Sequence, residues 1–159
     1  MVYKSILVGI DGSEHSYKAM MKAIELYKLY KCKVIVFHSV EHHAIPASDM
    51  VMAPSFAAPH IYHVSDPDIK RIREVYEKNA TAIIKRAEEI FLEAGVQVDA
   101  RLEPEYDPVS YIKELVKQGE VDLVILGSKG KHTLIGEVLL GSVTERVLRH
   151  VDCDIFIVR

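Results

Sequence analysis

Short apolar runs alternate with longer segments of helical period along the whole chain. The runs are rich in Val, Ile and Leu, and all but the third are apolar nearly throughout. Continuous runs of this kind are typical of parallel strands covered on both faces, whereas the third run alternates as a half-exposed edge strand does. We therefore predict five strands, at Ser5–Ile10, Val34–Val40, Val96–Glu103, Val121–Gly127 and Cys153–Arg159.

The segments between these runs carry the start and stop signals of helices. Ser13 or Asp11 can cap the first helix, and an Asp-Pro pair opens the second and the third. Gly95 can take the left-handed conformation that ends a helix. The predicted helices are Ser13–Tyr30, Asp66–Ala94, Pro108–Gly119 and Ser142–His150. The second carries an apolar stripe that we expect to be buried along its length, formed by Ile69, Ile72, Tyr76, Ala80, Ile83, Ala87, Ile90 and Ala94.

The alternation of strands and helices predicts an α/β fold. Helical crossovers between successive strands are right-handed and produce a parallel sheet. We predict an open, doubly wound five-stranded sheet of order 3-2-1-4-5 with helices on both faces. One domain is expected to span residues 1–159. Residues 41–65, which contain three prolines and four histidines without a clear period, are interpreted as a long loop.

Composition and charge limit the classes of partner that we expect the protein to bind. A formal net charge of −3 predicts no large positive field for nucleic acid. The sequence has no run of ~20 apolar residues that could span a bilayer, and its first residues do not resemble a signal peptide. Cys32 and Cys153 form no CxxC pair, so reduced, half-buried thiols are expected. These features predict a cytoplasmic protein without a nucleic-acid or membrane partner.

A glycine-rich stretch follows the fourth predicted strand, with Gly127, Gly130 and Gly141-Ser142 spaced as Gly-x2-Gly-x10-Gly-Ser. It is not a P-loop, because Ile125 stands where that motif needs glycine and His132 stands where it needs Ser or Thr. Glycines permit close backbone approach and positive φ. The start of the last helix offers free N–H groups, a general anion site. The alternative is that these glycines serve turns alone.

Further donors accompany the predicted anion site. Ser142 and Thr144 would add hydroxyl donors, Lys131 would add positive charge, and His15 could donate a hydrogen bond nearby. In an open parallel sheet, ligands bind beyond the carboxyl ends of the strands, at the point where the strand order reverses. The glycine stretch is expected at that point, next to the end of the first strand.

Four segments together resemble the universal stress protein family: SILVGIDGSEHS, VIVFHSV, VDLVILGSKGKH and LLGSVTERVLRHVDCDIFIV. The ATP-binding branch of that family carries Gly-x2-Gly-x9-Gly-Ser/Thr, one residue shorter than the stretch in this chain. The resemblance implies a site for ATP, ADP or AMP with Mg²⁺ or Mn²⁺ bridging the phosphates. It also implies a nucleotide-dependent switch or sensor in the stress response, which acts on a downstream protein partner.

The resemblance implies roles for individual positions. Asp11 would lie near the nucleotide, although Asp at this position can also be a helix cap. Gly9 and Ile10 would line the pocket, Ser39 would offer backbone groups to the adenine edge, and Leu126 would pack on the base. Gly127 and Gly130 would line the ribose and phosphates. The triphosphate would be held by Gly141, Ser142, Val143 and Thr144.

Two alternatives to an ATP-dependent switch remain open on the residues: an interaction module of the same fold without nucleotide, and a slow ATPase. No catalytic residue is assigned, because no side chain is placed to activate water. The histidines of the 41–65 loop lack the Cys or carboxylate spacing of a metal site, so no metal ligand is assigned.

A homodimer through the strand Cys153–Arg159 is predicted, because this apolar strand lies at a sheet edge in the 3-2-1-4-5 order. It resembles the usual dimer of the family. The alternative is a monomer whose edge is shielded by the 41–65 loop.

Overall fold

The computed structural model describes residues 3–40, 66–104, 106–130 and 140–159. Its sheet has five parallel strands in the order β3-β2-β1-β4-β5, which confirms the predicted fold. The strands are β1 (Ser5–Gly9), β2 (Lys33–Val40), β3 (Asp99–Pro104), β4 (Leu123–Gly127) and β5 (Asp154–Val158). The predicted 41–65 loop lies outside the described residues, as do Lys131 and His132.

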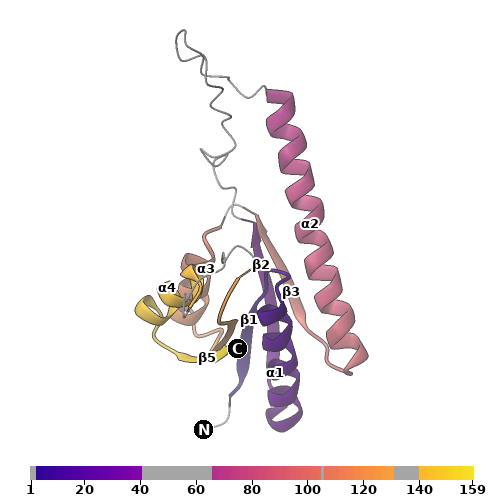
Figure 1. Cartoon of the computed structure of the whole chain (residues 1–159). Helices are drawn as coiled ribbons and strands as arrows, with labels where there is room; N and C mark the ends of the chain where they lie inside the picture. The colour runs from indigo at the N-terminus through magenta and orange to yellow at the C-terminus, as the bar shows by residue number, and fades with distance from the viewer. Residues whose placement is uncertain (1–2, 41–65, 105, 131–139) are drawn as a thin grey trace.

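Within the described residues, helices cover both faces of the sheet, as Figure 1 shows. They are α1 (Glu14–Tyr30), α2 (Asp66–Glu93), α3 (Pro108–Lys117) and α4 (Ser142–His150). One buried cluster lies between the sheet and α1 with α2, and a second lies between the sheet and α3 with α4. Among the described residues, none of the helices combines the length and apolarity that a membrane span requires.

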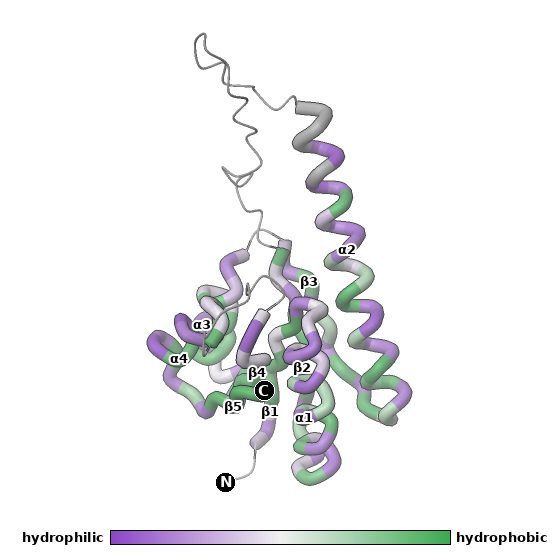
Figure 2. Tube along the Cα trace, in the orientation of Figure 1, coloured by the Kyte–Doolittle hydropathy of each residue, from purple (hydrophilic) through white to green (hydrophobic). Residues whose placement is uncertain are grey.

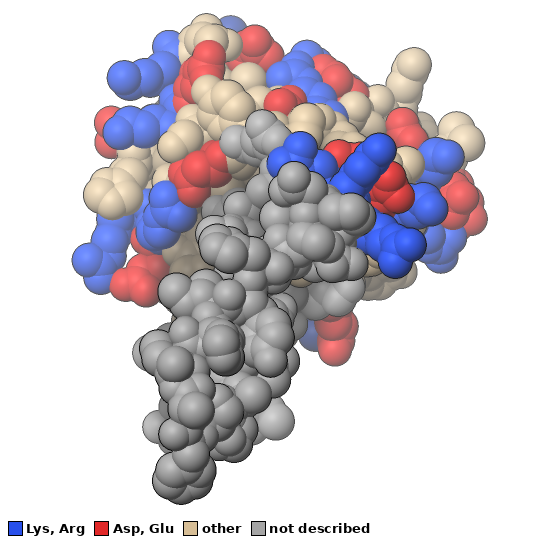
Figure 3. All heavy atoms as spheres, turned by 90° about the horizontal axis from the view of Figure 1, so that it is seen from above, with Lys and Arg blue, Asp and Glu red and all other residues tan. Residues whose placement is uncertain are grey.

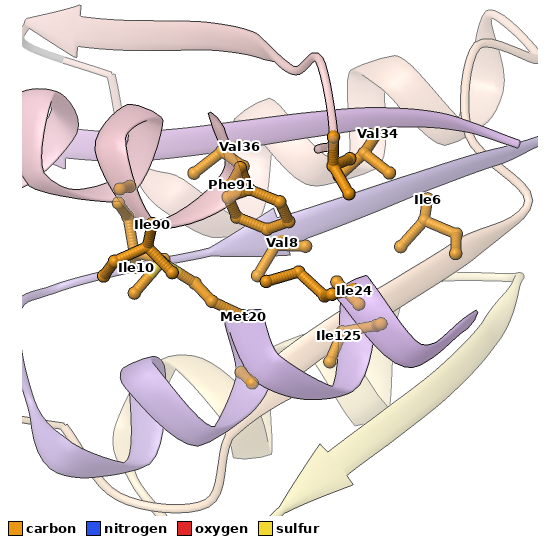
Figure 4. Close-up of a cluster of buried hydrophobic side chains, with 14 of the residues drawn as sticks. Ile6, Val8, Ile10, Met20, Ile24, Val34, Val36, Ile90, Phe91 and Ile125 are labelled. Carbon is orange, nitrogen blue, oxygen red and sulfur yellow. The ribbon is translucent and has the colours of Figure 1, made fainter. Parts of the chain in front are cut away.

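The cluster under α1 and α2 is the larger of the two (Figure 4). Ile6 and Val8 of β1 and Ile125 of β4 point into it and are fully buried. Phe91 of α2 reaches them from above and is also fully buried. Burial of each such side chain contributes roughly 1.5–3 kcal/mol, so this layer fixes β1 and β4 side by side at the centre of the sheet.

The third strand begins later than predicted, at Asp99 instead of Val96. Gly95 has a positive φ of 73°, and the N–H of Val96 donates to the carbonyl of Phe91 at 2.8 Å. This pattern closes the last turn of α2. Val96 is therefore part of the helix end, where its buried side chain belongs to the core under α2.

The apolar stripe of α2 is buried only in its second half, contrary to the prediction. Ala80, Ala87 and Ile90 are buried, whereas Tyr76 is 48% exposed and Val75 56% exposed. A helix of 28 residues is ~42 Å long, and the strands are much shorter. The first half of α2 therefore extends beyond the carboxyl ends of the strands (Figures 1 and 2). The side chains of Ile69 and Ile72 are outside the description.

Candidate functional site

The turn after β1 and the turn after β4 meet at the carboxyl edge of the sheet. β1 and β4 are adjacent strands, and the chain order reverses between them. A Cβ atom added to Gly130 would lie 2.9 Å from Asp11 Oδ2. The structure thus brings together two of the predicted site positions at the place where open parallel sheets bind ligands.

Asp11 has one oxygen in the turn and the other beside Gly130. Its Oδ1 accepts a hydrogen bond from the Ser13 N–H at 3.0 Å. The helix cap itself is Ser13, whose hydroxyl accepts from the Ser16 N–H at 3.1 Å. Asp11 therefore supports the start of α1 and still presents Oδ2 to the β4 turn.

The glycines of the motif bring three segments into close contact. A Cβ on Gly127 would lie 2.8 Å from the backbone carbon of His15, and a Cβ on Gly141 would lie 3.3 Å from the Gly130 nitrogen. Neither Gly127 nor Gly130 uses the positive φ that glycine permits. A side chain at Gly127 would clash with the backbone of α1, one at Gly130 would displace the Asp11 carboxylate, and one at Gly141 would press on the β4 turn.

The N-terminus of α4 has no side-chain cap. Gly141 is the N-cap and supplies no side-chain hydrogen bond. The first N–H groups of any helix lack partners inside it, and here they belong to Ser142, Val143 and Thr144. The hydroxyl of Thr144 donates to the carbonyl of Gly127 at 2.9 Å and is buried. The prediction that this hydroxyl donates to a ligand is therefore wrong, and its role is to fasten α4 to β4.

Leu126 and Ile10 both lie with their side chains in the core. Leu126 is 4% exposed and belongs to the cluster under α3 and α4, while Ile10 belongs to the cluster under α1. A Cβ on Gly9 would lie only 2.6 Å from Leu126 Cδ2. The absence of a side chain at Gly9 thus leaves room for the packing of Leu126.

Ser39 lies near the end of β2 on the far side of β1 from the glycine turn. Its hydroxyl donates to the carbonyl of Tyr106, in the segment between β3 and α3. The Ile10 N–H donates to the Phe37 carbonyl at 3.0 Å. Alternate residues of a parallel strand face the same neighbour, so the main-chain groups of Ser39 also face the β1 side.

Two histidines, His38 and His15, hold the turns of this edge. His38 Nδ1 lies 2.7 Å from the carbonyl oxygen of Ile10, so the imidazole donates there. His15 Nδ1 lies 2.9 Å from Ser128 Oγ. Ser128 is 1% exposed and was missed by the sequence analysis. Its partner is 113 positions away, so no local signal could have revealed the pair.

Charged groups beside α4 pair with each other. Arg146 donates to both oxygens of Asp107, the cap of α3, at 2.9 and 3.1 Å. Burial raises the pKa of the Asp107 carboxyl, but the bonds from Arg146 and Ser110 outweigh this effect and hold it below its ordinary value. Seen from above, basic and acidic side chains alternate around the described part of this face (Figure 3). Within the described residues there is no group of three or more His, Cys, Asp or Glu that could hold a metal ion.

The model of the universal stress protein family matches residues 2–159. The chain belongs to the universal stress protein family. It is 30% identical over 161 residues to universal stress protein YxiE of Bacillus subtilis, which covers 99% of this chain and 100% of the relative. It is also 30% identical to universal stress protein Sll1388 of Synechocystis, over 100% of this chain and 99% of the relative.

Solved structures of other universal stress proteins have the same fold. UspA of Lactobacillus plantarum superposes with a TM-score of 0.75 at 19% identity, covering 100% of this chain and 99% of the other. A family member from Archaeoglobus fulgidus in complex with dAMP gives 0.59 at 18% identity, over 100% of both chains. An Arabidopsis thaliana member with AMP bound gives 0.61 at 16% identity, over 98% of this chain and 90% of that one.

Proposed function

We propose that this universal stress protein binds an adenine nucleotide, ATP or its products ADP and AMP, and acts as a nucleotide-dependent switch in the stress response. The observation that carries the proposal is the open N-terminus of α4 next to the glycine turn and Asp11. Three N–H groups and a positive helix end attract phosphate. We expect Asp11 Oδ2 to contact the ribose and the backbone near Ser39 to contact the base.

The extra residue in the glycine motif does not separate its described ends. The Gly141 N–H donates to the Ser128 carbonyl at 2.7 Å, so the beginning and the end of the stretch are in direct contact. Relatives of the same fold have been solved with dAMP and with AMP. Both the contact and these complexes support adenine nucleotide as the ligand of this chain.

A divalent cation fits the charges of the proposed site. The Asp11 carboxylate lies at the same edge as the anion site of α4, and carboxylate and phosphate repel each other. Mg²⁺ or Mn²⁺ held between phosphate oxygens would relieve this repulsion, since both ions prefer oxygen ligands. We therefore expect nucleotide affinity to be higher with Mg²⁺ or Mn²⁺ than with a chelator present.

A switch is favoured over an enzyme by the state of the polar groups at this edge. Asp11 Oδ1 is engaged by Ser13, and His15 Nδ1 is engaged by Ser128. A proton taken from water at either of these two atoms would therefore replace a structural bond. Turnover is expected to lie far below the ~10 s⁻¹ typical of enzymes.

The decisive experiment measures ATP binding to the purified protein by calorimetry, together with mass spectrometry of any ligand released on denaturation. Gly130→Val and Gly141→Val should abolish binding, because a side chain at Gly130 displaces the Asp11 carboxylate and a side chain at Gly141 presses on the backbone of the β4 turn. Ala82→Val is the matched control, since it introduces the same side chain on the exposed face of α2. Circular dichroism verifies that each variant is folded.

Three results would contradict parts of this proposal. Unchanged ATP affinity in both glycine variants would refute the site. A wild-type protein that carries no nucleotide and ignores added ATP would favour an interaction module of the same fold. Rapid phosphate release without a partner would favour an ATPase.

We further propose a homodimer through β5, with the strands of two copies antiparallel. Phe156 is 42% exposed on this strand, and α1, which contacts β5, adds the exposed Tyr17 and Met21. Pairing of the two edges would cover these groups. The two nucleotide sites of such a dimer would each be linked to the interface by the β4–β5 pair.

A further inference from the structure

Ser128 connects three elements at the proposed phosphate site. Its N–H donates to the Val158 carbonyl of β5 at 2.7 Å, and its carbonyl accepts from Gly141, the cap of α4, at 2.7 Å. Its hydroxyl shares a hydrogen bond of 2.9 Å with His15 Nδ1 of α1. The residue is 1% exposed, so each of these bonds lies where an unpaired polar group is costly.

The position of the α4 N-terminus depends on the Ser128 carbonyl. Gly141 is the last residue before the helix, and its hydrogen bond to Ser128, together with the bond from Thr144 to Gly127, sets where the next three N–H groups point. A rotation of the Ser128 peptide would therefore move the phosphate-binding N–H groups without any change in their identity.

His15 is in turn held firmly by its own neighbours. It lies in the first turn of α1, and its backbone touches Gly127, where a Cβ would come within 2.8 Å. The Ser13 hydroxyl adds a 3.4 Å contact from the same turn to the Lys129 carbonyl. The imidazole thus starts from a fixed backbone and can orient the Ser128 hydroxyl.

We propose that Ser128, oriented by His15, is a positioning residue for the phosphate groups of the nucleotide. It acts through Gly141 and α4, and it touches the ligand with neither its hydroxyl nor its carbonyl, since both face protein partners. The inference rests on the proposed nucleotide site and adds two residues to it. Because the pair acts on the phosphate end, it affects ATP more than adenosine.

The test compares ATP with adenosine by calorimetry in four variants. Ser128→Ala and His15→Leu each remove the side-chain bond and should weaken ATP binding about tenfold, with less than about a twofold change for adenosine. His15→Asn keeps a polar group near the place of Nδ1 and should retain affinity close to that of the wild type. Ser16→Ala is the matched control, because it deletes another buried hydroxyl of α1 that bonds only within the helix turn.

A second measurement tests the effect of Ser128 and His15 on Gly141 in the absence of nucleotide. Hydrogen exchange of the Gly141 amide in the ligand-free protein should speed up about tenfold in Ser128→Ala and His15→Leu, and should stay unchanged in His15→Asn and Ser16→Ala. ATP binding and Gly141 exchange that are both indifferent to Ser128→Ala would overturn the inference. So would equal losses for ATP and adenosine, which indicate general destabilisation.

Failure of the proposed function would look different. A wild-type protein that binds neither ATP nor adenosine would refute nucleotide binding and the phosphate role together. Normal ATP binding by the wild type that persists in Ser128→Ala and His15→Leu would refute only the positioning role.

Discussion

The two edges of the sheet are built from the same backbone but protected differently. β3 carries alternating charges at Asp99, Arg101 and Glu103 and ends at Pro104. Arg101 donates to Asp99 at 2.8 Å, to Glu120 at 3.3 Å and to the Tyr111 hydroxyl at 3.2 Å. β5 has no charge between Asp154 and Arg159, and its side chains are only partly buried or exposed. The expectation that β5 is covered on both faces therefore fails in the single chain.

The main-chain groups of β5 show which residues face outward. The Ser128 N–H donates to Val158 O, and alternate residues of a strand face the same neighbour. Asp154, Phe156 and Val158 therefore direct their main-chain groups to β4, whereas Ile155 and Ile157 direct theirs to the free edge. Charges and proline discourage pairing at an edge. β3 has both along its length, whereas β5 has no proline and carries its one charge at its first residue, Asp154. We therefore expect β5, and not β3, to pair with a second copy.

The largest effect on the proposed pairing of β5 is expected from Ile157→Pro. Proline removes an N–H that faces the free edge but leaves the bonds of Phe156 and Val158 to β4 in place. We expect the proposed dimer to dissociate about 100-fold more readily, a change that corresponds to the loss of roughly 3 kcal/mol. Light scattering over a range of concentrations measures it. Ile157→Val keeps the N–H and should remain dimeric, and a wild-type mass of one chain would contradict the dimer.

A smaller effect is expected when the β3 edge loses its charge. Arg101→Val removes the bonds from Arg101 to Asp99 and Tyr111, leaves Asp99 paired with Lys33 alone, and places an apolar side chain on the edge. The ion pairs are partly exposed, so the free energy of unfolding should fall by only about 1 kcal/mol. The variant should also begin to self-associate, because it now resembles β5. Urea unfolding and light scattering measure the two effects, and a variant that stays as monodisperse as the wild type would show that the β3 charges do not protect the edge.

The smallest expected effect is on the pH dependence of the protein's stability. The hydrogen bond from Arg101, with a further contribution from Lys33, holds the pKa of the Asp99 carboxyl below its ordinary value of 3.8. A carboxyl with a lowered pKa in the folded state stabilises the protein at pH values above its ordinary pKa, and this stabilisation is lost as the pH falls through the folded value. Asp99→Asn should therefore lower the urea midpoint at pH 6 and hardly at all near pH 2. Glu88→Gln on the exposed face of α2 is the control, and an equal loss at both pH values would show that Asp99 acts by packing.

Much of the fold was predictable because the residues that start and end its helices are recognisable from the local sequence. α4 begins and ends where the sequence predicts, and Asp107 caps α3 as expected. The start of β3 was mispredicted because Val96 is apolar in either role, and only the hydrogen bond to Phe91 assigns it to the helix end. The stripe of α2 has the same period over its whole length, so its pattern could not show that the sheet ends near Ala80.

The positions of the candidate site were predictable from the sequence, but the contacts that explain these residues were not. The glycine spacing marks Gly127, Gly130 and Gly141, yet the reason for each glycine is a neighbour far away in the sequence, such as His15 or Asp11. The same holds for Ser128, whose hydroxyl is indistinguishable from that of a surface serine until its partner is known. Contacts between segments more than 100 residues apart leave no periodicity to detect.

The short helix α4 also has a consequence for how the protein folds. Nine residues are too few for a stable isolated helix, because the first turn costs more than the later turns return. Its anchors are distant in sequence: Thr144 to Gly127 over 17 positions, and Arg146 to Asp107 over 39. Such contacts form only after the chain between them has been closed into a loop. The anion-binding end of α4 is therefore expected to be a late product of folding, and a ligand that binds there selects molecules in which the folding of the sheet is already complete.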